Sequence, residues 1–151
     1  MLFRSTEDEI RRISHDLNKN LDFKDNHLSE IITNLISENQ KINQTIFDLT
    51  IDKYIDWEEV SGEIKINIYR IIQETIQNVN KYAKAQKCYI MLLKINKKIT
   101  LRIWDDGIGF NQDIVKTGIG IKNIKKRVQT MNAELKIESH VGKGTSIEVV
   151  I

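Results

Sequence analysis

The stretch WDDGIGFNQDIVKTGIGIKNIKKRV, residues 104–128, decides the fold. It begins where a predicted strand (99–105) ends, passes through two G-x-G pairs, and enters a predicted helix (about 119–132). Six of the seven glycines in the chain form three such pairs, the third being Gly142 and Gly144. Glycines grouped in this way indicate places where the backbone takes a positive φ or approaches another segment closely.

Outside this stretch, the spacing of apolar residues predicts the remaining elements. Helices are expected over residues 6–22, 27–41 and 62–82, and strands over 44–51, 88–95, 134–139 and 145–151. Because most strands follow one another as hairpins instead of alternating with helices, the order favours an α+β fold. We expect a two-layer sandwich, with helices on one face of a mixed, mostly antiparallel sheet and one further helix at the N-terminus.

Composition excludes several classes of function. A length of 151 residues fits one domain with a modest appendage. The net charge of +2 argues against a dedicated nucleic-acid binder, which usually carries a strongly basic domain. No stretch approaches the ~20 apolar residues that span a bilayer. The single cysteine, Cys88, suits a reducing compartment, so we expect a cytoplasmic protein.

The polar side of the helix predicted over 62–82 carries Glu74 and Asn78. These two residues are four apart, so they share one stripe of the helix. Lys81 and Tyr82 extend that stripe by one turn. A carboxylate above a carboxamide suits Mg²⁺, which prefers oxygen ligands and often bridges to phosphates. On spacing alone, a solvated helix face is the simpler alternative.

The glycine motifs suggest two further kinds of contact. Asp105 ends a strand, where a carboxylate can accept a hydrogen bond from an exocyclic amine, and the glycines after it let a flat ring approach. An ordinary Asp-Gly turn is the alternative. Gly118 and Gly120 open a helix whose free N–H groups and dipole favour phosphate. Gly142 and Gly144 form a tight turn before Thr145, and hairpin chemistry alone explains them.

In this order the four motifs resemble the ATP-binding catalytic domain of bacterial sensor histidine kinases, which shares its fold with gyrase and MutL ATPases. The matching segments are QETIQNVNKYAKA (73–85), WDDGIGF (104–110), TGIGIKNIKKRV (117–128) and GKGTSIEVVI (142–151). The resemblance covers about residues 28–151 and implies a Bergerat-type ATP-binding fold. We therefore divide the chain into an N-terminal helix over 1–24, a remnant of the dimerisation and phosphotransfer region, and an ATP-binding domain over 25–151.

The resemblance implies roles for the matched residues at the phosphate end of ATP. Asn78 would ligate Mg²⁺, and Glu74, one turn earlier, would polarise a water or shape the metal site. Lys81 and Tyr82 would lie near the phosphates.

The resemblance also implies an adenine pocket. Asp105 would bind the adenine amine, Gly107 and Gly109 would lie beneath the ring, and Thr145 would support the pocket.

A lid over residues 110–117 is implied as well, with Gly118 and Gly120 bordering the phosphates beneath it. The lid is short and lacks a phenylalanine-centred motif. In this it resembles the nitrate-sensor type of kinase, and NIKKRV (123–128) fits the same branch.

The phosphoacceptor box departs from the pattern of that branch. Read as S-H-D-L, residues 14–17 make His15 the acceptor, with Asp16 as its base or orienting group. In the nitrate-sensor register, R-I-x-x-[ED]-L-H-D, the histidine position falls on Asn18 and the aspartate on Lys19. Asparagine cannot accept a phosphoryl group. As a further alternative, His15 is an exposed helix histidine that takes no part in phosphoryl transfer.

The predicted N-terminal helix also lacks the second helix of a phosphotransfer hairpin. A two-helix phosphotransfer hairpin needs about 20–25 residues per helix, and too few residues separate the box from the next domain. The narrow stripe of Ile10, Ile13, Leu17 and Leu21 is typical of a coiled-coil seam, so it predicts a homodimer through this helix.

The resemblance implies a histidine kinase that binds Mg·ATP and donates the γ-phosphoryl group to a histidine. The phosphoryl group would then pass to an aspartate in the receiver domain of a response regulator. Contact with a membrane would come only through a sensor region absent from this sequence. One alternative is a degenerate kinase that binds ATP and regulates a partner. Another is an anti-sigma-type serine kinase, against which the His15-Asp16 pair argues because such a kinase needs no histidine box.

Overall fold

The computed structural model of the chain describes residues 27–113 and 118–151. The helix predicted over 6–22, His15 and the second half of the predicted lid (114–117) lie outside the described residues. The helices are α2 (His27–Ile42), η1 (Trp57–Glu59), α3 (Gly62–Asn78), η2 (Val79–Ala83) and α4 (Ile119–Thr130). The strands are β1 (Ile46–Ile51), β2 (Lys87–Ile95), β3 (Lys98–Asp105), β4 (Glu134–Ser139) and β5 (Thr145–Val150).

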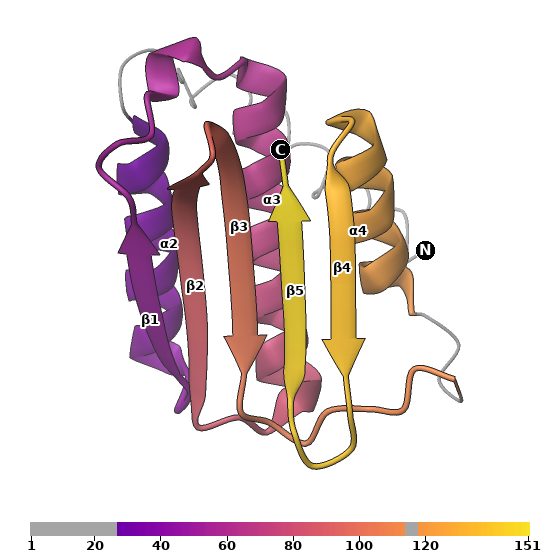
Figure 1. The fold of residues 1–151 in the computed structure, drawn as a ribbon. Coiled ribbons are helices and arrows are strands. Elements are labelled where there is room, and N and C mark those ends of the chain that lie inside the picture. Colours follow the sequence, from indigo (N-terminus) through magenta and orange to yellow (C-terminus); the bar gives the residue numbers. More distant parts are fainter. Residues whose placement is uncertain (1–26, 114–117) are drawn as a thin grey trace, which may run out of the picture.

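The five strands form one sheet in the order β1-β2-β3-β5-β4. β1 pairs with β2 in parallel, and the other three pairings are antiparallel. Helices α2, α3 and α4 all lie on one face of this sheet (Figure 1). The predicted α+β fold, a layer of helices on a mixed and mostly antiparallel sheet, is therefore confirmed.

The core lies between the two layers. Alternate strand residues face the helices, because successive side chains of a strand point to opposite faces. The fully buried core side chains include Ile90 and Leu92 of β2, Leu101 of β3, and Ile68 and Ile72 of α3. Burying one such side chain stabilises the fold by about 1.5–3 kcal/mol. This packing fixes α3 across the middle of the sheet.

The other face of the sheet carries no helix in the described part of the chain. Tyr89 and Trp104 are paired across β2 and β3, and their rings stack with centroids 4.8 Å apart. Arg102 of β3 and Glu148 of β5 form an ion pair on the same face. The face is thus partly solvated, as the alternating strand pattern predicted.

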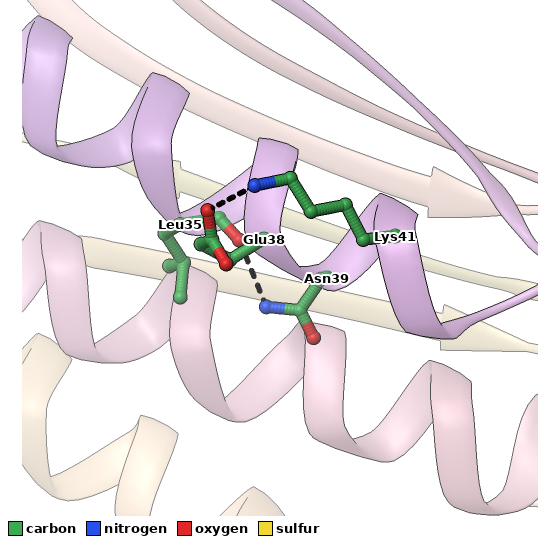
Figure 2. Close-up of polar contacts among 4 residues, drawn as sticks. All are labelled: Leu35, Glu38, Asn39 and Lys41. Carbon is green, nitrogen blue, oxygen red and sulfur yellow. Dashed lines mark hydrogen bonds and ion pairs between the residues drawn. The ribbon is translucent and has the colours of Figure 1, made fainter.

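Helix α2 is joined through Asn39 to η2, the turn that follows α3. The Nδ2 atom of Asn39 donates to the carbonyl of Leu35 at 2.9 Å, beside an exposed ion pair between Glu38 and Lys41 (Figure 2). Because its amide nitrogen is held in this way, the Asn39 oxygen is left to accept a hydrogen bond from Nδ2 of Asn80, at 3.3 Å. This contact ties α2 to η2.

The predicted α-helix over 62–82 was wrong in its last turn. Helix α3 begins after Ser61, whose hydroxyl accepts the N–H of Ile64 at 3.3 Å, and it ends at Asn78. The chain then continues as the π-helical turn η2, and it leaves this turn through Lys84 in the left-handed region. A π turn is wider than an α turn and is common near functional sites. Here it carries the carbonyl of Ala83 to the loop after β3, where it accepts the N–H of Ile108 at 2.8 Å.

The turn between β4 and β5 provides a test of this packing. Gly142 and Gly144 both have positive φ, of 77° and 75°. A Cβ at Gly144 would overlap the backbone carbonyl of Asp105, whereas a Cβ at Gly142 would meet open space. Gly144→Ala should therefore lower the free energy of unfolding by about 2–5 kcal/mol, through backbone strain and overpacking together.

Gly142→Ala is the matched control, because it adds the same strain without the overlap. It should cost only about 1–2 kcal/mol in urea denaturation. Equal losses in the two variants would show that the approach to Asp105 places no constraint on the fold.

Candidate functional site

Asp105 ends β3 as a buried carboxylate, with 8% of its surface exposed. Its Oδ1 atom accepts the N–H of Gly107 at 2.8 Å. Burial raises the pKa of this carboxyl group, and the N–H groups of Gly107 and Thr145 partly offset that rise. Cys88, its partner across the β2–β3 ladder, is fully buried, and burial followed by the charges of Asp105 and Asp106 raises the pKa of its thiol to about 12.

Three loops meet around this carboxylate, at the end of the sheet where β3 finishes and β4 turns into β5 (Figure 1). The carbonyl of Ile108 accepts the N–H of Gly142 at 2.7 Å. A Cβ at Gly107 would overlap the carbonyl of Ala83, and a Cβ at Gly109 would overlap that of His140. These two glycines were predicted to make room for a flat ring. In the structure they make room for neighbouring backbone.

Ser139 was not singled out from the sequence, yet it joins two of these loops. Its hydroxyl accepts the N–H of Phe110 at 2.9 Å and donates to the carbonyl of Gly144 at 3.1 Å. It also lies 2.9 Å from the hydroxyl of Thr145, its partner across the β4–β5 pairing. The register of the predicted hairpin was the one signal that could have placed Ser139 beside Thr145.

Asp106 takes a structural role that differs from that of its neighbour. Its Oδ1 atom accepts the backbone N–H groups of Gln86 and Lys87, at 2.8 and 2.9 Å. This carboxylate therefore anchors the start of β2 to the loop after β3. Of the two aspartates in the motif, only Asp105 is buried.

A second group of residues gathers where α4 begins. Glu74 and Asn78, both half-buried on α3, approach Gly120 in the first turn of α4. A Cβ at Gly120 would lie 2.5 Å from Oε1 of Glu74, 3.0 Å from Nδ2 of Asn78 and 3.1 Å from its Oδ1. The N-cap residue, Gly118, provides no side-chain hydrogen bond to the free N–H groups of this turn. Two side-chain oxygens and a positive helix end therefore face the same place.

The remaining predicted residues occupy the edge of this group. A Cβ at Gly118 would meet open space. Of these two glycines, only Gly120 must lack a side chain, because another helix lies close to it. Lys81 and Tyr82 lie on η2 and are exposed, with 68% of the Tyr82 surface accessible. Their predicted position near phosphates stays a prediction.

The donor set suits a hydrated hard cation. Within residues 27–113 and 118–151, no three His, Cys, Asp or Glu side chains are grouped so as to hold a metal. Glu74 and Asn78 would offer two oxygens, and Mg²⁺ commonly takes its remaining ligands from water and phosphate.

Two cavities of about 510 and 430 Å³ lie elsewhere, between α2 and β1, where both are lined by Thr33 and Leu49. Neither cavity is lined by a residue of the candidate site, such as Asp105, Glu74 or Asn78.

A family model described as histidine kinase-, DNA gyrase B-, and HSP90-like ATPase matches residues 63–151. This segment includes α3 except its first residue, α4, Asp105 and all three G-x-G pairs, and it is more than half of the chain. The chain belongs to this ATPase family. Its resemblance to the ATP-binding domain of sensor histidine kinases is thereby confirmed.

Curated relatives of this family member are sensor kinases. It is 39% identical over 90 residues to the sensor histidine kinase ComP of Bacillus subtilis, a match over 58% of this chain and 12% of ComP. It is 34% identical over 127 residues to the sensor protein VraS of Staphylococcus saprophyticus, over 83% of this chain and 35% of VraS. The chain thus spans well under half the length of either relative.

A solved structure supports the same fold. The blue-light activated histidine kinase EL346 of Erythrobacter litoralis superimposes with a TM-score of 0.69 over 82% of this chain and 41% of that one, at 18% identity. Among the residues that the structure describes, no helix has both the length and the apolar character to cross a bilayer.

Asp105→Asn should abolish ATP binding while leaving the fold intact. The amide can still accept the N–H of Gly107, but its NH₂ group would oppose a donor on the base. Such a mismatch costs about 1–3 kcal/mol or more. Isothermal titration with ATP measures the effect, and unchanged affinity would contradict the assignment.

Asp106→Asn is the matched control, because its amide oxygen can still accept from the start of β2. It should bind ATP as the wild type does. Since burial raises the pKa of Asp105 in the folded state, the wild type should gain stability relative to Asp105→Asn as pH falls through that pKa. Thermal melts across acidic pH would detect this gain.

Proposed function

We propose that this chain is the ATP-binding catalytic region of a sensor histidine kinase, which binds Mg·ATP and donates the γ-phosphoryl group to a histidine. The observation that carries the proposal is the meeting of Glu74 and Asn78 with the uncapped start of α4. A buried carboxylate, Asp105, lies at the end of the neighbouring strand β3. Glu74, Asn78 and the start of α4 would bind a cation and an anion. Asp105 would accept a hydrogen bond from a base.

At the base end, the fixed carboxylate of Asp105 would accept a hydrogen bond from the exocyclic amine of adenine. The N–H groups of Gly107 and Thr145 orient this carboxylate, and its remaining lone pairs would accept a hydrogen bond from a ligand. Thr145, held by Ser139, would support the wall of this pocket.

At the phosphate end, Asn78 would ligate Mg²⁺ and Glu74 would orient one of the waters bound to the metal. The free N–H groups of the first turn of α4 would bind phosphate oxygens. Lys81 and Tyr82 would approach the phosphates from η2. Mg²⁺ and these donors would neutralise the charge that develops as the phosphoryl group leaves.

In the transfer, a P–N bond to an imidazole nitrogen forms while the P–O bond to the departing ADP breaks. The imidazole proton passes to an acidic neighbour. His15 with Asp16 is the candidate pair in this chain. The phosphoryl group would then move to an aspartate of a response-regulator receiver domain.

The N-terminal segment would supply the rest of the assembly. We propose that residues 1–24 form a helix that pairs two chains through Ile10, Ile13, Leu17 and Leu21, and that 25–151 is the ATP-binding domain. Such a dimer could bring His15 to the partner's ATP site. The kinase would act in the cytoplasm, and a sensor region outside this sequence would provide any contact with a membrane.

A second candidate is a degenerate kinase that binds ATP and regulates a partner without phosphorylating itself. The identity of Asn18 favours it, because this residue occupies the histidine position in the nitrate-sensor register.

Asn78→Ala should remove the dependence of ATP affinity on Mg²⁺, because it deletes a metal-binding oxygen. Titrating ATP with and without Mg²⁺ measures the ratio of the two affinities. That ratio should fall towards one in the variant.

Asn80→Ala is the control on the same segment, since Asn80 bonds to Asn39 of α2 and not to α4. It should keep the full effect of the metal. An Asn78→Ala variant that also kept it would place the cation elsewhere.

His15→Gln should eliminate acid-labile labelling by γ-labelled ATP and leave ATP binding untouched. The expectation rests on Asp16 beside His15 and on the coiled-coil seam of the same segment. Labelling of the full chain, followed by tests of acid and base stability, distinguishes phosphohistidine from phosphoserine.

Two results would reject His15 as the acceptor. One is a wild type that binds ATP but never labels, which would favour the regulatory module. The other is label that persists in the variant. In the first case, Asn18→His with Lys19→Asp should restore labelling, because it rebuilds the pair in the nitrate-sensor register.

A further inference from the structure

Helices α3 and α4 meet at two levels that lie two turns apart. At the first, Gly120 of α4 approaches Glu74 and Asn78 of α3. At the second, Arg127 of α4 donates to Asn67 of α3. Glu74 lies seven residues after Asn67, and Arg127 lies seven after Gly120, so each pair shares one face of its helix.

Asn67 is a fixed acceptor at the second level. It is buried, with 6% of its surface exposed, and its Nδ2 atom donates to the carbonyl of Glu63 at 2.9 Å. Since the nitrogen is held by its own helix, the oxygen must face α4. It accepts a hydrogen bond from Nη1 of Arg127 at 3.2 Å. A bond with an orientation set in this way resists sliding of one helix along the other.

The charge of Arg127 also reaches the first level. Its guanidinium is half-buried, and burial lowers its pKa, as does the nearby charge of Arg70. The carboxylate of Glu74 acts in the opposite direction and stabilises the charged form. Arg127 is therefore hydrogen-bonded to the buried amide of Asn67 and lies within the electrostatic influence of the Glu74 carboxylate on α3.

Apolar packing holds α4 on the core but supplies no hydrogen bond that aligns it with α3. Ile124 and Val128 are buried against the core, but such contacts are not directional. The helix begins at Gly118 without a side-chain cap. The hydrogen bond between Arg127 and Asn67, two turns further along α4, is therefore suited to set the position of the first turn of this helix.

We propose that Arg127 is a positioning residue, which through its bond to Asn67 holds the first turn of α4 against Glu74 and Asn78. This inference rests on the proposed function, in which that turn binds the phosphates of ATP. Arg127 itself touches neither the phosphates nor the base. Its effect should be confined to ligands that carry phosphate.

The test compares two ligands of the full chain: a non-hydrolysable ATP analogue with Mg²⁺, and adenosine. Arg127→Met keeps the aliphatic stem and removes the donor. The affinity for the ATP analogue should fall about tenfold, as for a lost hydrogen bond to a charged group, while that for adenosine stays within about twofold. NMR titration suits the weaker ligand.

Three further variants sharpen the comparison. Asn67→Ala should reproduce the loss, and the double variant should lose no more than either single one, because the partners act as a pair. Arg127→Lys keeps one donor and should recover part of the affinity. Arg102→Met, which removes an arginine from the opposite face of the sheet, should change neither affinity.

Several outcomes would overturn the proposal. The proposal is contradicted if Arg127→Met and Arg127→Lys each weaken the binding of both ligands equally, or if they weaken the binding of neither. It is also contradicted if the losses of Arg127→Met and Asn67→Ala add in the double variant. A wild type that binds adenosine and the ATP analogue equally well or not at all would overturn the proposed function itself. Thermal melts of every variant show whether the chain remains folded.

Discussion

The approach of Gly144 to the backbone carbonyl of Asp105 is the contact on which the rest of the site depends. With any side chain at Gly144, the β4–β5 turn would have to move away from the end of β3. The N–H of Thr145 would leave the carboxylate with it, and Ser139 would lose the carbonyl that its hydroxyl bonds. Burial of Asp105 is thus a product of backbone packing, and its raised pKa follows from that burial.

Two asparagines connect helices of the described layer to neighbouring elements in the same way. Asn39 and Asn67 each donate through Nδ2 to a carbonyl four residues earlier in their own helix. The amide oxygen is left to accept from a neighbouring element, Asn80 in one case and Arg127 in the other. Asparagine is a weak helix former because its side chain competes for backbone groups. Here the same capacity lets it bond its own helix and a neighbour at once.

Much of the fold could be predicted from periodicity, because each strand alternates and each helix has one apolar stripe. The boundaries of β2 and β3 differ by one residue from those predicted, and β1 begins at Ile46 instead of residue 44. The turn η2 was missed, since an inserted residue leaves the apolar spacing nearly unchanged. Three residues, Trp57–Glu59, are too few to show a period, so η1 was missed as well.

The candidate site was predicted less completely than the fold. Glycine spacing identified the loops, but the reason for Gly107 and Gly109 lies in Ala83 and His140, which are distant in sequence. Asp105 and Asp106 are adjacent in the sequence, and only their hydrogen-bond partners in the structure distinguish their roles. Contacts that join separate elements, such as that of Arg127 with Asn67, were also not predicted from the sequence. Such pairs leave no local pattern in a single sequence.

The two ends of the site are built from different kinds of contact, and this bears on how a nucleotide would be bound. Around Asp105 the restraints are backbone hydrogen bonds and glycine contacts, which form when the chain folds. A base entering there meets donors and acceptors already in place, so little ordering remains to oppose binding. At the start of α4 the restraints are side chains, and glycines at Gly118 and Gly120 weaken the first turn. In the proposed function, the base would therefore meet a preformed pocket, whereas the position of the phosphates would depend on side-chain contacts such as that of Arg127 with Asn67.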